Sequence, residues 1–109
     1  MVFESVEDLL EQFPPGWREI SRALAEVFVR DQIEVFQVKE KFGGLRVYIG
    51  SALEDVHRLI DNVEAKSFHV CEVCGASGEL RNDLSWVLTL CEEHYEERLA
   101  QGWARRNKD

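Results

Sequence analysis

Three cysteines and one histidine between residues 71 and 94 have the types and the spacing of a metal site. Cys71 and Cys74 form a C-x-x-C pair, and Cys91 and His94 repeat that separation after sixteen intervening residues. A tight turn brings two such thiolates onto one ion, and side chains three positions apart share one face of a helix. Thiolate sulfur and imidazole nitrogen are favoured in tetrahedral zinc sites. The sequence therefore predicts a structural Zn²⁺ bound by Cys71, Cys74, Cys91 and His94.

The composition of this ligand set argues against catalysis by the ion. Four protein ligands close the coordination shell, so no position is left at which a water molecule could be ionised. All three cysteines of the chain belong to the set, whereas His69, a spare candidate ligand, lies only two residues from Cys71 and fits the pattern less well. We therefore expect the zinc to stabilise a fold, and we predict that the protein is not an enzyme.

The segments around the ligands resemble a treble-clef zinc fold over residues 71–107. Strands are expected at 79–81 and 86–90, joined by a turn at Asn82-Asp83, and a helix is expected to begin near Cys91. HNH-type nucleases also contain a treble clef, in which the first hairpin strand ends in a histidine-bearing motif that activates water. Residues 80–83 read LRND here, without a histidine. An HNH-like nuclease is therefore the least favoured function.

The N-terminal part must supply a scaffold for this metal-binding element. Ser5 is a good N-cap for a first helix, which should stop at Pro14-Pro15-Gly16. A second helix is expected over residues 17–30, where apolar residues recur at helical spacing. A third is expected over 51–68, with Ser51 and Glu54 as a capping box. The tryptophans Trp17, Trp86 and Trp103 are expected to be core anchors.

A β-hairpin is predicted between the second and third helices. β-Branched and aromatic residues flank Gly43-Gly44, a dipeptide suited to a two-residue turn. With that turn, Phe42 faces Leu45 and one sheet face is apolar except for a glutamate: Phe36, Val38, Glu40, Phe42, Leu45, Val47 and Ile49. The other face presents Val35, Gln37, Lys39, Lys41, Arg46 and Tyr48 to the solvent. The alternation thus places three cations and one aromatic ring on a single exposed face.

These elements together predict an α+β fold: N-terminal helices, a β-hairpin and a third helix, followed by a treble-clef-like zinc element of knuckle, short hairpin and helix. With 109 residues, of which 45% are hydrophobic, we expect a single domain over residues 1–109. Its two parts are a helix–helix–hairpin–helix part (1–68) and a zinc-binding part (69–109). No apolar run of about 18 residues and no signal-peptide pattern occurs, so we expect a cytoplasmic protein without a membrane partner.

The charge distribution bears on the kind of partner. The formal net charge of −8 argues against a protein devoted to binding nucleic acid phosphates, which depends on clustered lysine and arginine. Residues 1–34 carry eight acids and three bases, and residues 71–97 carry seven acids and one base. Cations gather near the middle and at the C-terminal end, as Lys39, Lys41 and Arg46, and as Arg98, Arg105, Arg106 and Lys108. An acidic body with two basic regions is expected.

Over its whole length the chain resembles a family of small bacterial and phage-encoded proteins. The matching motifs are PGW at residues 15–17, KEKFGGLR at 39–46, and CEVCG and LCEEH around the cysteines. The resemblance implies a shared architecture with a KEKFGGLR-type hairpin and a C-terminal treble-clef-like zinc site. It also indicates that the KEKFGGLR segment matters, although a hairpin with a good core face explains much of that motif structurally.

Non-enzymatic binding is the function that these patterns favour. A small zinc-stabilised protein-interaction module or inhibitor would contact a protein partner through the polar hairpin face, the acidic helices or both. The alternative is a nucleic-acid-binding treble-clef protein that uses the hairpin cations together with Arg105, Arg106 and Lys108. The candidate binding residues in either case are Lys39, Lys41, Arg46 and Tyr48.

Overall fold

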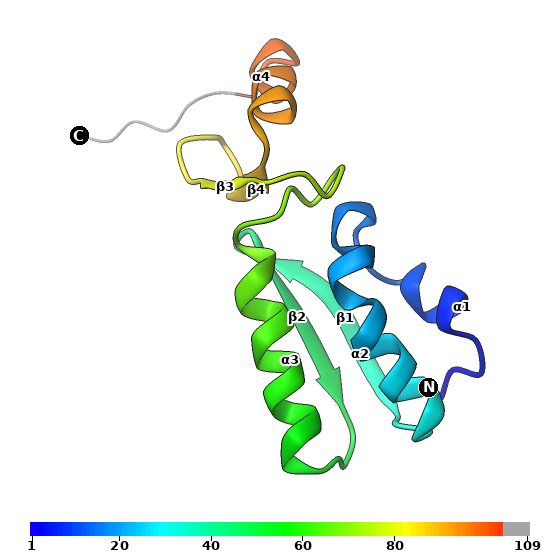
Figure 1. Ribbon diagram of the computed structural model, residues 1–109. Helices are drawn as coiled ribbons and strands as arrows, with labels where there is room; N and C mark the ends of the chain where they lie inside the picture. The colour runs from blue at the N-terminus through cyan, green and yellow to red at the C-terminus, as the bar shows by residue number, and fades with distance from the viewer. Residues whose placement is uncertain (104–109) are drawn as a thin grey trace.

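The computed structural model describes residues 1–103, and Arg105, Arg106 and Lys108 of the proposed C-terminal basic region lie outside them. The α+β class and the predicted order of elements are confirmed (Figure 1). The elements are α1 (Val6–Leu10), a 3₁₀ turn (Pro15–Trp17), α2 (Arg18–Arg30), β1 (Val35–Lys41), β2 (Gly44–Ile49), α3 (Glu54–Ser67), β3 (Glu79–Arg81), β4 (Leu88–Leu90) and α4 (Glu92–Ala100). None of the helices among residues 1–103 is long and apolar enough to cross a membrane.

Local sequence signals set most helix boundaries. The Ser5 hydroxyl accepts a hydrogen bond from the Asp8 N–H at 3.3 Å, which confirms the first N-cap. The helix ends at Leu10, with Glu11 as its C-cap, and so stops four residues before the expected stop at Pro14. The capping box at Ser51 is wrong, because α3 begins only at Glu54 and its N-cap, Leu53, provides no side-chain bond. The chain is still extended at Leu53, where ψ is 160°.

The hairpin turn lies one residue earlier than predicted. Lys41 pairs with Gly44, so Phe42 and Gly43 are the two turn residues. Their φ angles are 53° and 84°, and a type I′ hairpin turn requires positive φ at both positions. Gly44 is instead the first residue of β2, and a Cβ there would overlap the ring of Phe68. Close packing on α3, rather than turn geometry, therefore explains the second glycine.

A β-bulge moves Phe36 out of the core. Val35 pairs with Ile49 and Gln37 pairs with Tyr48, so Phe36 is the extra residue in β1. Phe36 is 63% exposed whereas Val35 is buried, which reverses the prediction for both. An inserted residue shifts the alternation between the sheet faces by one position. The prediction failed here because it assumed regular alternation along the whole strand.

Strand β2 alternates as predicted, whereas residues 38–40 of β1 are all half-buried. Leu45 and Val47 are buried, and Arg46 and Tyr48 are exposed. Phe42, which was expected in the core, is 68% exposed because it occupies the turn. Phe42 thus combines an exposed aromatic ring with a left-handed backbone conformation, which residues other than glycine and asparagine rarely adopt.

Replacing Phe42 by asparagine should raise the free energy of unfolding by about 1 kcal/mol, because asparagine tolerates the left-handed conformation that costs a bulky residue roughly 1–2 kcal/mol. Little packing is lost, since the ring is mostly exposed. Urea unfolding measures the change. Phe42→Ala, which removes the ring but keeps the strain, is the control and should bring no gain. An asparagine variant no more stable than the original chain would contradict the expectation.

Helices α2 and α3 pack against each other as one helical layer of the N-terminal part, and α3 runs along β2 of the hairpin layer (Figure 1). The main hydrophobic cluster lies between these layers and comes entirely from the N-terminal part: Leu9, Leu10, Phe13, Trp17, Leu24, Ala25, Phe28, Ile33, Val35, Leu45, Val47, Val56, Ile60 and Val63. A second, smaller cluster belongs to the metal-binding part: Cys71, Leu84, Leu88, Leu90, Cys91 and Tyr95. No helix formed by residues 1–103 covers the opposite face of the hairpin (Figure 1), where Gln37, Lys41, Arg46 and Tyr48 are exposed.

Candidate metal centre

The four predicted ligands come together at one point. Their ligand atoms all lie within 4.8 Å of one another, and no other such group of three or more occurs among residues 1–103. Cys74 Sγ is 3.8 Å from Cys91 Sγ, and His94 Nδ1 is 3.6 Å from Cys71 Sγ and 3.2 Å from Cys91 Sγ. The side chains of four residues from two separate segments therefore surround a single position that could hold a metal ion.

A tight knuckle positions the first two ligands. The Gly75 N–H donates to the Cys71 carbonyl at 2.9 Å, and the Cys71 N–H donates to the Ala76 carbonyl at 2.7 Å. Gly75 has a φ of 84°, a conformation that glycine adopts without steric cost. A bridge between Val70 and Ser77 closes the base of the knuckle. The C-x-x-C-G pattern thus forms a turn in which both thiols point to the same side.

The start of α4 positions the other two ligands. Cys91 is the N-cap of this helix, and its sulfur accepts a hydrogen bond from the His94 N–H at 3.5 Å. One turn later, the His94 ring directs Nδ1 toward the sulfur atoms. Negative charge is stabilised at a helix N-terminus. The helix end therefore orients Cys91, and it is a favourable place for the negative charge of a metal-bound sulfur.

The electrostatics of the thiols suit a cation. Burial disfavours the Cys71 thiolate, but the backbone N–H groups of Cys91, Cys74 and Val73 outweigh burial and lower the pKa of Cys71 to about 7. The pKa of Cys74 is raised: a backbone hydrogen bond from Ala76 favours its thiolate, but desolvation and the neighbouring sulfurs oppose it. The first negative charge thus forms easily and makes the second harder to form. A divalent cation at the centre would relieve this repulsion.

The 3₁₀ turn at Pro15–Trp17 docks directly on the knuckle. The Gly16 N–H donates to the Glu72 carbonyl at 2.8 Å, and the buried Trp17 indole N–H donates to the Val70 carbonyl at 2.8 Å. A Cβ on Gly16 would overlap the Cys71 carbonyl oxygen. Sequence reasoning treated this turn only as a helix stop. The three-residue PGW motif is therefore a contact between the two parts of the chain.

The β1–β2 turn docks on the other side of the metal-binding part. The Thr89 hydroxyl donates to the Gly43 carbonyl at 2.6 Å, and a Cβ on Gly43 would overlap Leu80 of β3. Thr89 is fully buried, so this hydrogen bond is protected from water. The glycines of KEKFGGLR thus allow the hairpin tip to approach the short β3–β4 hairpin closely.

HNH-type nucleases carry a histidine at the end of the first hairpin strand. In this chain the residues at that place, Arg81 and Asp83, make structural contacts. Asp83 accepts a hydrogen bond from the Tyr95 hydroxyl at 2.5 Å. The Arg81 guanidinium lies over the Tyr95 ring at 4.3 Å and pairs with Glu92 at 3.3 Å. These side chains fasten the loop after β3 to α4. Trp86, in the same loop, is 59% exposed and is not the core anchor that was expected.

One carboxyl group beside the centre has a perturbed acidity. Burial, with a smaller contribution from Glu40, raises the pKa of Glu72 to about 7. Its Oε2 atom is buried and has no hydrogen-bond partner among residues 1–103. A catalytic acid or base needs a reacting group within hydrogen-bond reach and a space for substrate. Glu72 as a residue is half-buried, and no side chain that could react lies within hydrogen-bond distance of its Oε2 atom among residues 1–103.

The four candidate binding residues share the exposed face of the hairpin. Lys39 is paired with Arg46 across the ladder, and its ammonium lies 5.5 Å from the centre of the Tyr48 ring. Arg46 also forms an ion pair with Glu64 at 3.8 Å. Neither Lys39 nor Lys41 forms an ion pair with another part of residues 1–103. The two lysines are therefore the cations of this face that remain available to a ligand.

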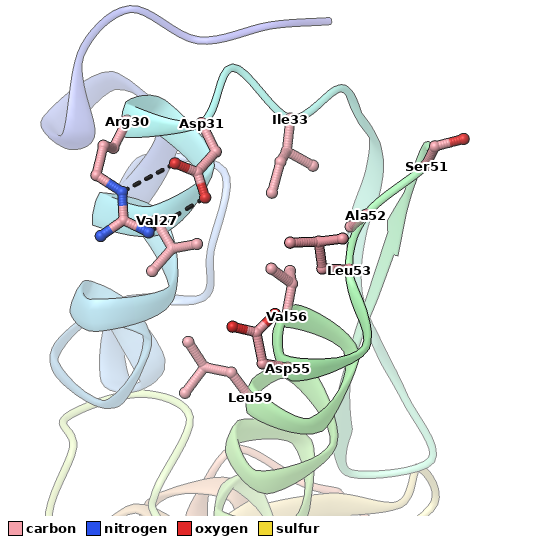
Figure 2. A pocket seen from close by; sticks show the side chains of 10 residues that line it. All are labelled: Val27, Arg30, Asp31, Ile33, Ser51, Ala52, Leu53, Asp55, Val56 and Leu59. Atoms are coloured by element: carbon pink, nitrogen blue, oxygen red, sulfur yellow. Dashed lines mark hydrogen bonds and ion pairs between the residues drawn. The ribbon is translucent and has the colours of Figure 1, made fainter.

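A cavity of about 510 Å³ lies between the end of α2 and the start of α3, at the end of these helices away from the cysteines (Figures 1 and 2). Polar and apolar groups contribute about equally to its walls, and Arg30 and Asp31 point toward each other (Figure 2). Their two hydrogen bonds measure 2.9 and 3.1 Å and lower the pKa of Asp31. A carboxylate held ionised in this way is not an effective base near neutral pH.

The chain matches no known family model, no curated protein and no solved structure. Functional inference therefore depends on the chemistry of the residues described above.

Proposed function

We propose that this chain is a non-enzymatic, zinc-stabilised binding protein, a protein-interaction module or inhibitor, that contacts its partner through the exposed face of the β1–β2 hairpin. The geometry of the Cys71, Cys74, Cys91 and His94 cluster is the observation that supports a structural zinc ion. In a tetrahedral site, Zn–S bonds of about 2.3 Å and Zn–N bonds of about 2.0–2.1 Å separate ligand atoms by roughly 3.5–3.8 Å. The S···S distance of 3.8 Å and the S···N distances of 3.2 and 3.6 Å lie close to these edges.

The same geometry supports the absence of catalysis at the ion. Four protein ligands fill a tetrahedron and leave no position for water or substrate. Asp83, which stands where a nuclease would need catalytic groups, is hydrogen-bonded to Tyr95. We therefore expect no cleavage of DNA or RNA when magnesium, manganese or zinc is supplied.

The composition of the exposed hairpin face supports a protein partner. Tyrosine, phenylalanine and arginine are enriched in protein interfaces, and Phe36, Phe42 and Tyr48 are exposed on or beside this face at 63, 68 and 42%. A partner would bury these rings and meet Lys39 and Lys41 with carboxylates. A nucleic acid partner would use the same rings for stacking and the same lysines for phosphate.

Reversing the charges of Lys39, Lys41 and Arg46 to glutamate should weaken binding to the partner that co-purifies with the tagged chain at least 10-fold, because carboxylates of the partner would then meet like charge. Affinity is measured by titration calorimetry after zinc content and fold have been checked. The matched control reverses Arg22, Arg30 and Arg58, which lie on helices, and should retain affinity.

Salt dependence separates the two partner classes. Phosphate binding through about two free lysines should weaken with a log–log slope of roughly −2. A protein interface should depend less on salt and more on Tyr48, whose replacement by alanine should cost at least about 1 kcal/mol. Unchanged affinity of the triple variant would remove the hairpin face as the binding surface and leave the acidic helices.

A further inference from the structure

The two outer edges of the β1–β2 sheet differ in the hydrogen bonds that their outward backbone groups form. On β2, the outward N–H groups of Leu45 and Val47 donate to the Ser67 hydroxyl and the Glu64 carboxylate, both at 2.9 Å. Both acceptors belong to α3, which stands beside β2 (Figure 1). This edge of the sheet is therefore closed by side chains of a helix.

Among residues 1–103, the outer edge of β1 has a backbone hydrogen-bond partner at one end, at Val35. At Val35 it pairs with the first residue of the chain: the Met1 ammonium donates to the Val35 carbonyl at 2.9 Å, and the Val35 N–H donates to the Met1 carbonyl at 2.8 Å. Two bonds exchanged between the same two residues are the unit of an antiparallel ladder. The edge thus already exchanges two backbone hydrogen bonds with one residue of another segment at its beginning.

Beyond Val35, two outward N–H groups of this edge have no hydrogen-bond acceptor in the part of the chain that the structure describes. Antiparallel pairs alternate between those that bond to each other and those whose backbone groups point outward. Leu45 and Val47 point outward on β2, so their partners Glu40 and Val38 point outward on β1. Neither of these two N–H groups has a hydrogen-bond acceptor among residues 1–103.

We propose that an extended segment of a protein partner adds to β1 as an antiparallel third strand, bonded to the backbone of Val38 and Glu40. This inference rests on the proposed function and specifies how the hairpin engages its partner. Strand addition takes its affinity from main-chain hydrogen bonds and its specificity from alternate side chains. The new strand would lie beyond the bulge at Phe36, which separates Val38 and Glu40 from the Val35–Met1 pair.

Side chains of the hairpin define the chemistry of this segment. Residues opposite Lys39 and Lys41 would share the exposed face with two lysines that lack an ion pair with the rest of residues 1–103. Acidic side chains fit these positions. The residue opposite Val38 faces the core side and should be apolar, since Val38 packs against the main cluster. The expected segment alternates acidic and apolar residues.

Two other occupants, a second copy of this chain and a nucleic acid, fit the β1 edge less well. A second copy of this chain would bring an edge with the same unpaired lysines, and lysine on an edge strand opposes such self-pairing. The negative charge of Glu40 lies on the other face of the hairpin from the lysines, where Glu40 pairs with Leu45, and its carboxylate accepts a hydrogen bond from the Gly43 N–H at 2.6 Å. An acidic segment of another protein fits this edge better than a nucleic acid, which has no strand backbone to pair.

The first test uses a nine-residue peptide of alternating valine and glutamate as the probe, with the full-length, metal-loaded chain labelled with ¹⁵N. Amide shifts should change over residues 36–41, and hydrogen exchange at the Val38 and Glu40 amides should slow at least 10-fold. A peptide with lysine in place of glutamate should bind at least 10-fold more weakly. Methylating the peptide nitrogens that face β1 should cause a similar loss. Equal binding of the methylated peptide, or tighter binding of oligothymidylate, would overturn the proposal.

The second test changes the edge itself. Val38→Pro removes the outward N–H without removing a β1–β2 bond, and should weaken peptide binding at least 10-fold, whereas Val38→Thr keeps the N–H and should change it less than 3-fold. If the proline variant does not fold, the methylated peptide decides. If the Val38→Pro variant binds the co-purified partner at full strength while the charge-reversal variant loses binding, strand addition is refuted. The hairpin face then remains the binding surface. Full binding by the charge-reversal variant would instead refute the proposed function.

Discussion

Replacing Cys91 by alanine should abolish stoichiometric zinc binding and unfold the metal-binding part of the chain. A structural zinc ion contributes on the order of 10 kcal/mol to folding under favourable conditions. Segments below about 40 residues usually need such a contribution because their core is too small. The second hydrophobic cluster illustrates this, since it has six buried residues and two of them are metal ligands: Cys71, Leu84, Leu88, Leu90, Cys91 and Tyr95.

Elemental analysis and thermal unfolding followed by circular dichroism measure this effect. His69→Ala is the matched control, because His69 lies two residues before Cys71 in the sequence and is not a member of the ligand cluster. That variant should retain one zinc ion and nearly its full melting temperature. Freshly purified protein without stoichiometric metal would refute the zinc assignment, and so would a Cys91→Ala chain as stable as the original.

The N-terminal part should keep much of its structure after metal removal, because the main hydrophobic cluster runs from Leu9 to Val63 and contains no ligand. Its contact with the knuckle should still change. The Trp17 indole N–H donates to the Val70 carbonyl at the base of the knuckle. Tryptophan fluorescence should therefore shift when a chelator is added, even where helical content persists.

Replacing Gly16 by alanine should lower the free energy of unfolding by about 3 kcal/mol or more, at the upper end of the cost of overpacking. The added Cβ would overlap the Cys71 carbonyl oxygen and lie 2.6 Å from the carbonyl carbon of Glu72. Both neighbours are backbone atoms of the knuckle and cannot rotate away. The 3₁₀ turn must then withdraw, which also breaks the Gly16 N–H bond to Glu72.

Gly50→Ala is the matched control for this substitution. A Cβ at Gly50 would meet its nearest atom at 3.5 Å, an ordinary contact, and its φ is not positive. That variant should change stability by less than about 1 kcal/mol. Because the knuckle carries two ligands, Gly16→Ala should also weaken zinc affinity, measured by competition with a chelator. Equal stability of the two variants would show that the docking of PGW on the knuckle is wrong.

Residue types and local spacing alone determined the metal ligands. Cys71 with Cys74, and Cys91 with His94, are each separated by three residues, so a turn or a helix start is sufficient to direct both members of a pair to one side. Local signals also predicted α1, α2 and the order of knuckle, short hairpin and helix. Such features depend on neighbours within about one helical turn, which the sequence displays directly.

Tertiary structure decided the register of the β1–β2 hairpin and its exposed surface. Two adjacent glycines permit a turn at either of two positions, and local sequence does not choose between them. Gly44 must lie against Phe68, and the Gly43 carbonyl accepts a hydrogen bond from Thr89. These contacts join residues more than 20 positions apart in sequence. The turn therefore falls on Phe42 and Gly43 despite the unfavourable backbone conformation of Phe42.

The meeting of the two parts of the chain was likewise visible only in three dimensions. Gly16 is required because a carbonyl of the knuckle lies where its side chain would be. The bulge at Phe36 exposes an aromatic ring that regular alternation assigns to the core. A period of two predicts which face a residue occupies only while the ladder is unbroken. One extra residue breaks the ladder at Phe36, and the break adds an exposed ring to the hairpin besides Tyr48.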